Sequence, residues 1–111
     1  AGRAVRAQNC AKAWVTFDGT AGSPTAADSF GVTSITKHAA GDYTINFAAG
    51  IFSSANYCSV GTAGSTTSTG FFTVRGPVNS LPTTTAYRCR VSDSVPNYLD
   101  VNHICIAFFG D

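Results

Sequence analysis

Apolar and polar side chains alternate along residues 43–47, where Tyr43, Ile45 and Phe47 are separated by polar residues. This period of two is the pattern of a β-strand with one buried face. Residues 32–36, VTSIT, are rich in β-branched side chains, and the connection between the two segments contains Gly41, which can adopt a positive φ. Together they predict a β-hairpin with one apolar face, which is a typical part of a β-sandwich or a small barrel.

Similar short apolar segments recur along the chain and are separated by turns that contain glycine or proline. They predict seven strands, at about residues 12–18, 30–37, 42–48, 56–63, 70–75, 85–92 and 101–109. Strands at a spacing of ~8–12 residues are typical of an all-β sandwich or barrel. We therefore predict a single antiparallel β-sandwich domain of seven to eight strands over residues 10–111, with residues 1–9 as a linker or the end of a shaft.

The last predicted strand, residues 101–109, is apolar on both faces. In an antiparallel sandwich of this size the outer face of a strand is normally wet, so a second covered face indicates a neighbouring subunit. Phe71 and Phe72 repeat this indication, because adjacent side chains in a strand point to opposite faces. We expect the subunit interface to contain Trp14, Phe72, Ile104, Ile106 and Phe108. An outward Trp14 that stacks on a sugar ring is the alternative for that residue.

The composition agrees with this fold and excludes several partners. The 111 residues include no Glu and no Met, whereas Thr, Ser, Val, Gly and Phe are frequent. The net charge is only +1, so we expect no nucleic-acid partner. No apolar segment is long enough for a membrane span, and no basic-then-apolar leader is visible.

Four cysteines, at positions 10, 58, 89 and 105, lie far apart and form no CxxC pair. We favour free, buried thiols in apolar strands, with one or two disulfides as the alternative. His103 and Cys105, joined by Cys58 or Cys89, are a conceivable zinc site, but structural zinc sites usually contain closely spaced ligand pairs. We therefore expect a histidine beside core thiols, and neither a metal nor a cofactor.

The chain contains no nucleophile elbow, no HExxH and no phosphate-binding glycine loop. Its carboxylates are all aspartates, and most of them lie in segments that are typical of Asx-turns. A glycosidase needs two carboxylates within ~5–9 Å of each other, and no pattern in the sequence pairs them. We therefore expect that the protein is not an enzyme.

Several segments resemble the C-terminal receptor-binding (head) domain of tailed-bacteriophage tail fibre proteins. They are Cys10 with the strand AWVTF at 13–17, VTSIT at 32–36, GDYTINF at 41–47, ANY at 55–57 and the ending FFGD at 108–111. The resemblance implies a β-sandwich that forms a homotrimer about the fibre axis, continues from an upstream shaft and binds a host-surface glycan or protein. It places the protein at the tail fibre tip of a virion, outside the cell when it acts and made in the host cytoplasm. Residues 18–28 depart from the family pattern, so the specificity is not carried over.

If the N-terminus joins a shaft and successive strands are antiparallel, loops 18–29, 49–55 and 76–84 and the C-terminus lie far from the shaft. Connections 38–41, 64–69 and 93–100 would then lie near it. This geometry predicts a receptor-contact set of Asp18, Thr20, Ser23, Phe52, Asn79 and Ser80.

Three other functions stay open at this point. The domain could be a structural trimerisation module of a virion, whose loops bind nothing. It could be an enzyme that trims surface polysaccharide, or a secreted monomeric lectin that contains disulfides.

Overall fold

The computed structural model describes residues 10–67, 70–93 and 97–111, and these residues form eight β-strands and no helix. The all-β prediction is thereby confirmed. The predicted linker at 1–9 lies outside the described residues. The described part of the chain contains no helix that could cross a membrane. The strands are β1 (Ala13–Phe17), β2 (Ala26–Phe30), β3 (Val32–Ala39), β4 (Asp42–Phe47), β5 (Cys58–Gly64), β6 (Phe72–Arg75), β7 (Ala86–Asp93) and β8 (His103–Phe109).

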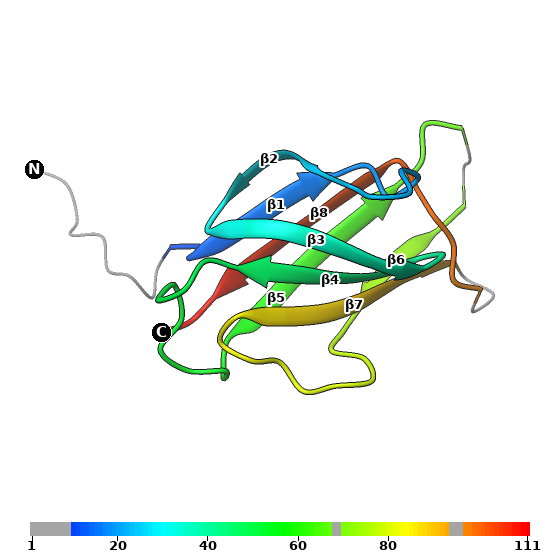
Figure 1. Ribbon diagram of the computed structural model, residues 1–111. Coiled ribbons are helices and arrows are strands. Elements are labelled where there is room, and N and C mark those ends of the chain that lie inside the picture. Colours follow the sequence, from blue (N-terminus) through cyan, green and yellow to red (C-terminus); the bar gives the residue numbers. More distant parts are fainter. Residues whose placement is uncertain (1–9, 68–69, 94–96) are drawn as a thin grey trace, which may run out of the picture.

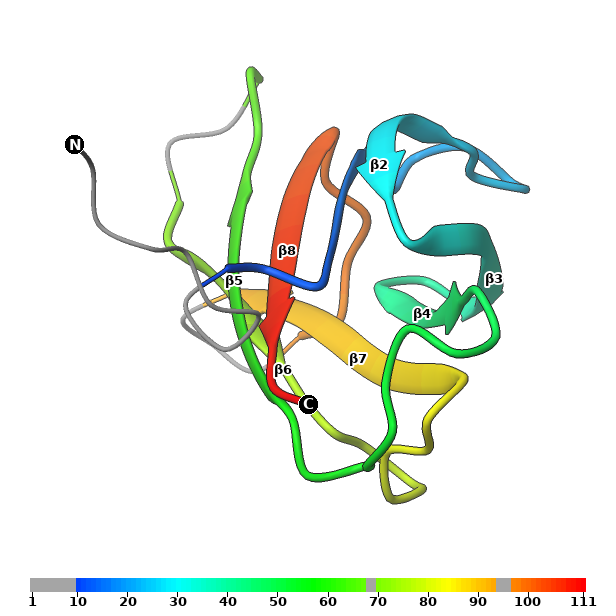
Figure 2. The same ribbon diagram turned by 90° about the vertical axis from the view of Figure 1, so that its left-hand side faces the viewer.

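The strands form two four-stranded sheets, each antiparallel throughout. The first sheet has the order β2-β1-β8-β5, and the second has the order β3-β4-β7-β6. Figure 1 shows the second sheet lying in front of the first, and the end-on view in Figure 2 shows the two layers side by side. Because each sheet buries one face against the other, the sandwich has one internal core and two outer faces.

The core between the sheets is built from the alternating positions of the strands. In the first sheet, Ala13 lies opposite Phe108, Val15 opposite Ile106 and Phe17 opposite Ile104, and all six side chains are buried. The second sheet contributes Tyr43, Ile45, Phe47, Tyr87, Cys89 and Val91. The buried face predicted for residues 43–47 is therefore present, and residues 13–17 alternate in the same way.

The structure corrects four of the five predicted interface residues. Ile104, Ile106 and Phe108 are almost completely buried inside the sandwich, so they are core residues rather than an exposed interface. Phe72 also packs against the core, whereas its neighbour Phe71 is 82% exposed. Only Trp14, which is 36% exposed, points outward as expected.

Strand β2 was not among the predicted strands, and it changes the geometry of the ends. Its sequence, AADSF, does not alternate, because β2 is an edge strand whose side chains are mostly exposed. An additional antiparallel strand between β1 and β3 reverses the direction of every later strand relative to the prediction. The predicted distribution of loops between the two ends is therefore wrong.

We call the end of the sandwich that contains the start of β1 the N-terminal end, and the opposite end the distal end (Figure 1). The N-terminal end contains the turn at Gly31, segments 48–57 and 76–85, and the C-terminus. The distal end contains loop 18–25, the turn 40–41 and the described parts of segments 65–71 and 94–102. Residues 68–69 and 94–96, which belong to two predicted near-shaft connections, lie outside the described residues.

The predicted receptor-contact set is divided between these two ends. Asp18, Thr20 and Ser23 are exposed in the distal loop, but Asn79 and Ser80 are exposed at the N-terminal end. Phe52 is only 4% exposed, so its side chain is not available to a receptor.

Phe52 belongs to a cluster of aromatic rings that closes the core at the N-terminal end. Its ring centroid lies 5.0 Å from that of Phe47 and 4.4 Å from that of Tyr57. Phe108 contacts both Phe47 and Tyr57 from the first sheet. Edge-to-face and stacked pairs of this kind stabilise a core beyond the area they bury.

We expect Phe52→Ala to lower the free energy of unfolding by about 3–5 kcal/mol, because it removes a buried ring and leaves a cavity. The matched control is Phe71→Ala, which truncates an exposed ring and should change stability by less than about 0.5 kcal/mol. Urea denaturation followed by circular dichroism measures both values. Equal effects of the two substitutions would contradict the assignment of Phe52 to the core.

Candidate functional site

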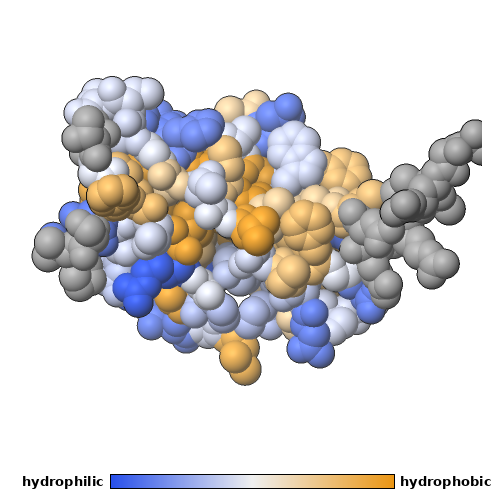
Figure 3. Space-filling view, turned by 180° about the vertical axis from the view of Figure 1, so that it is seen from behind, coloured by the Kyte–Doolittle hydropathy of each residue, from blue (hydrophilic) through white to orange (hydrophobic). Residues whose placement is uncertain are grey.

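The outer face of the first sheet carries a row of apolar side chains that crosses all four strands. Phe30 lies opposite Trp14, Trp14 opposite Ala107, and Ala107 opposite Val60. We call these four residues the outer row. Phe30, Trp14 and Val60 are 57%, 36% and 59% exposed, and such a continuous row of large apolar side chains is unusual on a water-facing surface. Figure 3 shows hydrophobic side chains gathered over this face.

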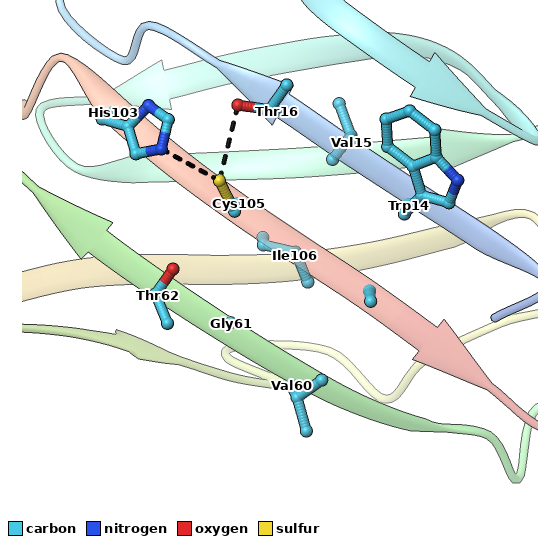
Figure 4. A pocket seen from close by; sticks show the side chains of 10 residues that line it. Trp14, Val15, Thr16, Val60, Gly61, Thr62, His103, Cys105 and Ile106 are labelled. Carbon is cyan, nitrogen blue, oxygen red and sulfur yellow. Dashed lines mark hydrogen bonds between the residues drawn. The ribbon is translucent and has the colours of Figure 1, made fainter.

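The outer row is hollowed in its middle, because the small side chain of Ala107 lies between Trp14 and Val60. The hollow has a volume of about 540 Å³, and its lining is almost entirely apolar. Figure 4 shows Trp14 on β1 and Val60 on β5, on either side of β8. Such a surface binds by burial of apolar area rather than by hydrogen bonding.

The distal side of the hollow contains its few polar groups. The thiol of Cys105 lies 3.2 Å from His103 Nε2 and 3.4 Å from Thr16 Oγ1 (Figure 4). Neither proposed third zinc ligand joins this pair, since Cys58 lies at the other end of β5 and Cys89 lies in the core. Within the described residues, no three His, Cys, Asp or Glu side chains form a group that could hold a metal ion.

The four cysteines are free thiols in this structure, with Cys10 and Cys58 exposed. Burial, with a further contribution from the charge of Asp42, raises the pKa of Cys89 to about 12. That thiol is therefore protonated and unreactive in the folded protein.

The outer face of the second sheet is polar, in contrast to that of the first. Asn46 donates hydrogen bonds from its side-chain amide to Ser34 Oγ at 3.0 Å and to Thr36 Oγ1 at 3.1 Å. His38 Nε2 lies 2.7 Å from Thr44 Oγ1. Hydroxyls and amides that satisfy one another across strands suit a water-facing surface. The two outer faces thus have opposite characters.

The loops of the distal end are joined by the carboxylate of Asp100. Its Oδ2 lies 2.8 Å from Lys37 Nζ, and its Oδ1 accepts hydrogen bonds from the Gly41 amide at 2.8 Å and the Tyr43 hydroxyl at 2.9 Å. Lys37 also donates to the carbonyls of Gly19 and Ala21, each at 3.1 Å. One ion pair with its hydrogen bonds therefore links loop 18–25, the hairpin of β3 and β4, and segment 97–102. We call this group the distal network.

The distal network changes the ionisation of two of its members. Partial burial favours protonation of Asp100, but the hydrogen bonds from Lys37, Gly41 and Tyr43 and the charge of Lys37 outweigh it, so the pKa of Asp100 is lowered. Burial, and next the hydrogen bond to Asp100, raise the pKa of Tyr43. The network is therefore anionic at Asp100, with a neutral Tyr43, around neutral pH.

Sequence reasoning did not identify the distal network, because Lys37 and Asp100 are 63 residues apart and no local pattern connects them. The loop residues that it did identify lie beside the network. Asp18 Oδ1 accepts hydrogen bonds from the Thr20 hydroxyl and amide at 2.6 and 2.9 Å, and these bonds lower the pKa of Asp18. Loop 18–25 is thus held by the distal network and by its own turn.

We expect Asp100→Asn to lower the free energy of unfolding at pH 7 by about 1–3 kcal/mol, because charge-assisted hydrogen bonds are lost. The native pKa of Asp100 is below its ordinary value of 3.8, so its contribution is complete above that pH and is lost as the pH falls through the native pKa. The difference in the free energy of unfolding between wild type and variant should therefore become smaller as the pH is lowered from about 5 to about 2. Urea denaturation over that pH range measures it, and a constant difference would contradict this role.

Comparison of the chain with protein-family models, with curated proteins and with solved structures found no match in any of the three. The functional proposal therefore rests on the geometry of the residues described above and on the resemblance of the sequence segments to tail fibre head domains.

Proposed function

We propose that this chain is a non-enzymatic host-recognition domain that forms a homotrimer at the tip of a bacteriophage tail fibre. The observation that carries the proposal is the contrast between the two outer faces of the sandwich. One face presents large apolar side chains to solvent, and the other is polar and internally hydrogen-bonded. This contrast supports a domain that associates through its first sheet and exposes its second sheet.

The outer row is the proposed subunit interface. Complete burial of a large apolar side chain such as Phe30 or Val60 is favourable by about 1.5–3 kcal/mol. The monomer gains only part of this free energy, because both side chains are more than half exposed, and burial at an interface would supply the rest. Aromatic residues are enriched in the centre of interfaces, as Trp14 and Phe30 would be here. The proposed occupant of the hollow is a second copy of the chain, because the row crosses the full width of the sheet and is continuous rather than enclosed.

The distal end is the proposed receptor-contact surface, because it lies opposite the end at which an upstream shaft would be attached. Asp18, Thr20 and Ser23 are exposed there, and the distal network holds their loop against two other connections. A loop that is ordered before binding loses less conformational entropy on contact with a ligand. Asn79 and Ser80 are not part of this surface, because they lie at the N-terminal end.

We expect the wild-type chain to have about three times the 11.5 kDa mass of one chain in multi-angle light scattering. Val60→Asp should shift it to the monomer, because a charge buried at an apolar interface is strongly unfavourable. Val60 is 59% exposed in the isolated chain, so an aspartate there can reach water and the variant monomer should stay folded. Circular dichroism checks that it does. The matched control is Leu81→Asp, which changes an 84% exposed apolar residue in another segment and should leave the trimer intact. A monomeric wild-type chain would overturn the proposed interface.

Receptor binding is tested with the fluorescently labelled trimer on a panel of bacterial strains, together with competition against phage adsorption. Ser23→Trp should weaken binding at least about tenfold, because the large ring obstructs the distal surface. Ser80→Trp is the matched control at the N-terminal end and should bind as the wild type does. Equal losses for both variants would contradict a distal contact. A folded trimer that labels no strain and does not compete would favour the structural trimerisation module.

A further inference from the structure

Three arginines gather on the outer face of the second sheet, beside the hydroxyl-bearing part of that face. The register places Arg90 opposite Asp42 on one side and opposite Arg75 on the other, and it places Arg88 opposite Thr44. Because paired residues of neighbouring strands share a face, all of these side chains point outward from the sandwich. Figure 1 shows β4 and β7 side by side at the front of the molecule, and β6 pairs with the other edge of β7.

The single carboxylate of this group is already occupied by two of the arginines. Arg88 binds Asp42 with two hydrogen bonds, from Nε at 3.0 Å and from Nη2 at 2.8 Å. Arg90 Nε lies 3.4 Å from the same carboxylate. The hydrogen bonds from Arg88, against a smaller effect of burial, lower the pKa of Asp42, so it is ionised around neutral pH. One negative charge therefore faces three positive charges.

Arg75 is the guanidinium that this arrangement leaves without a counter-charge. Its side chain is exposed, and within the described residues it forms no ion pair or hydrogen bond. It lies directly opposite Arg90, a like-charge pair that destabilises a sheet. Asp93, the acidic residue of β7, lies opposite Phe72 and accepts a hydrogen bond from the Asn97 backbone amide. The patch therefore has an excess of two positive charges in a chain whose net charge is only +1.

The groups around the arginines suit a hydrated ligand. The guanidinium of Arg90 lies 4.6 Å from the centre of the Tyr98 ring, and that ring is 45% exposed. The exposed Thr73 lies next to them, with its Oγ1 3.2 Å from the Oγ of the buried Ser92, and Thr44 lies opposite Arg88. An exposed aromatic ring with hydroxyls is a common surface for a sugar, and guanidinium groups bind carboxylate, sulfate and phosphate in a bidentate manner.

We infer that the face formed by Arg75, Arg90 and Tyr98 binds an anionic saccharide, with Arg75 and Arg90 on its acidic group and Tyr98 against its ring. As a statement about the host receptor, this inference rests on the proposed function and extends the distal contact onto the adjoining face, since Asp42 follows the distal turn 40–41 and Tyr98 lies in a distal segment. As a statement about binding, it does not depend on a phage origin or on trimer formation. Arg75 and Arg90 supply the positive charge, and the ligand supplies the anion that would relieve their repulsion.

The test is isothermal titration of the full chain with an oligogalacturonate and with a sulfated oligosaccharide of similar length. A neutral maltooligosaccharide and inorganic phosphate are the comparison ligands. We expect the wild-type chain to bind at least one anionic oligosaccharide, and the neutral one more weakly by about tenfold or more. Preference for the carboxylated or the sulfated probe identifies the acidic group. Phosphate binding as strong as that of the oligosaccharides would overturn the assignment of a sugar.

Arg75→Gln should weaken binding of the anionic oligosaccharide by roughly ten- to a hundredfold, because one charge-assisted contact is lost. It should leave the fold as stable as the wild type or more stable, since the like-charge pair is removed. Lys12→Gln is the matched control, which removes the same charge from a residue outside the patch. Equal weakening by both variants, or no binding of either anionic probe, would overturn the inference.

The same variant separates this inference from the proposed function. Cell labelling that persists in Arg75→Gln would overturn an anionic saccharide as the receptor and leave host recognition standing. Saccharide binding without labelling of any strain would overturn host recognition and leave the binding face standing.

Discussion

The pairing of β1 with β8 is the constraint on which the rest of the structure depends. These strands come from opposite ends of the chain and lie at the centre of the first sheet. Their register places Ile104, Ile106 and Phe108 opposite the inward residues of β1, and therefore inside the core. The same register places Ala107 between Trp14 and Val60, which creates both the outer row and its hollow. The core and the candidate interface are thus two consequences of one long-range pairing.

The sandwich has two outer faces and two ends, and each has a distinct chemical character. The apolar face of the first sheet suits a dry contact, whereas the second sheet presents hydroxyls and three arginines to water. The aromatic cluster closes the N-terminal end by packing, and the ion pair of Lys37 and Asp100 holds the distal end by polar contacts. Under the proposed function, subunit association and ligand contact use separate surfaces, so each can change without loss of the other.

Much of the fold could be predicted because most strands have one buried face. All seven predicted strands are present. The cysteines are free thiols as predicted, but only Cys89 is buried, whereas Cys10 and Cys58 are exposed. β2 was missed because an edge strand with exposed side chains has no alternation. That omission reversed the later strands, so Asp18 and Asn79 were assigned to one end although they lie at opposite ends. Phe52 was expected in a contact loop because an aromatic ring near turn residues gives no indication of whether it is buried.

The sequence by itself determined the fold class, the positions of most strands and the inward faces of segments such as 13–17 and 43–47. These properties depend on local alternation, which each segment displays without its neighbours. Only the tertiary structure decided which face of β8 is buried, because both faces are apolar and the choice depends on the register with β1. It also decided the distal network and the opposition of Arg75 and Arg90. Those contacts join residues that are distant in the chain, so strand order and register alone bring them together.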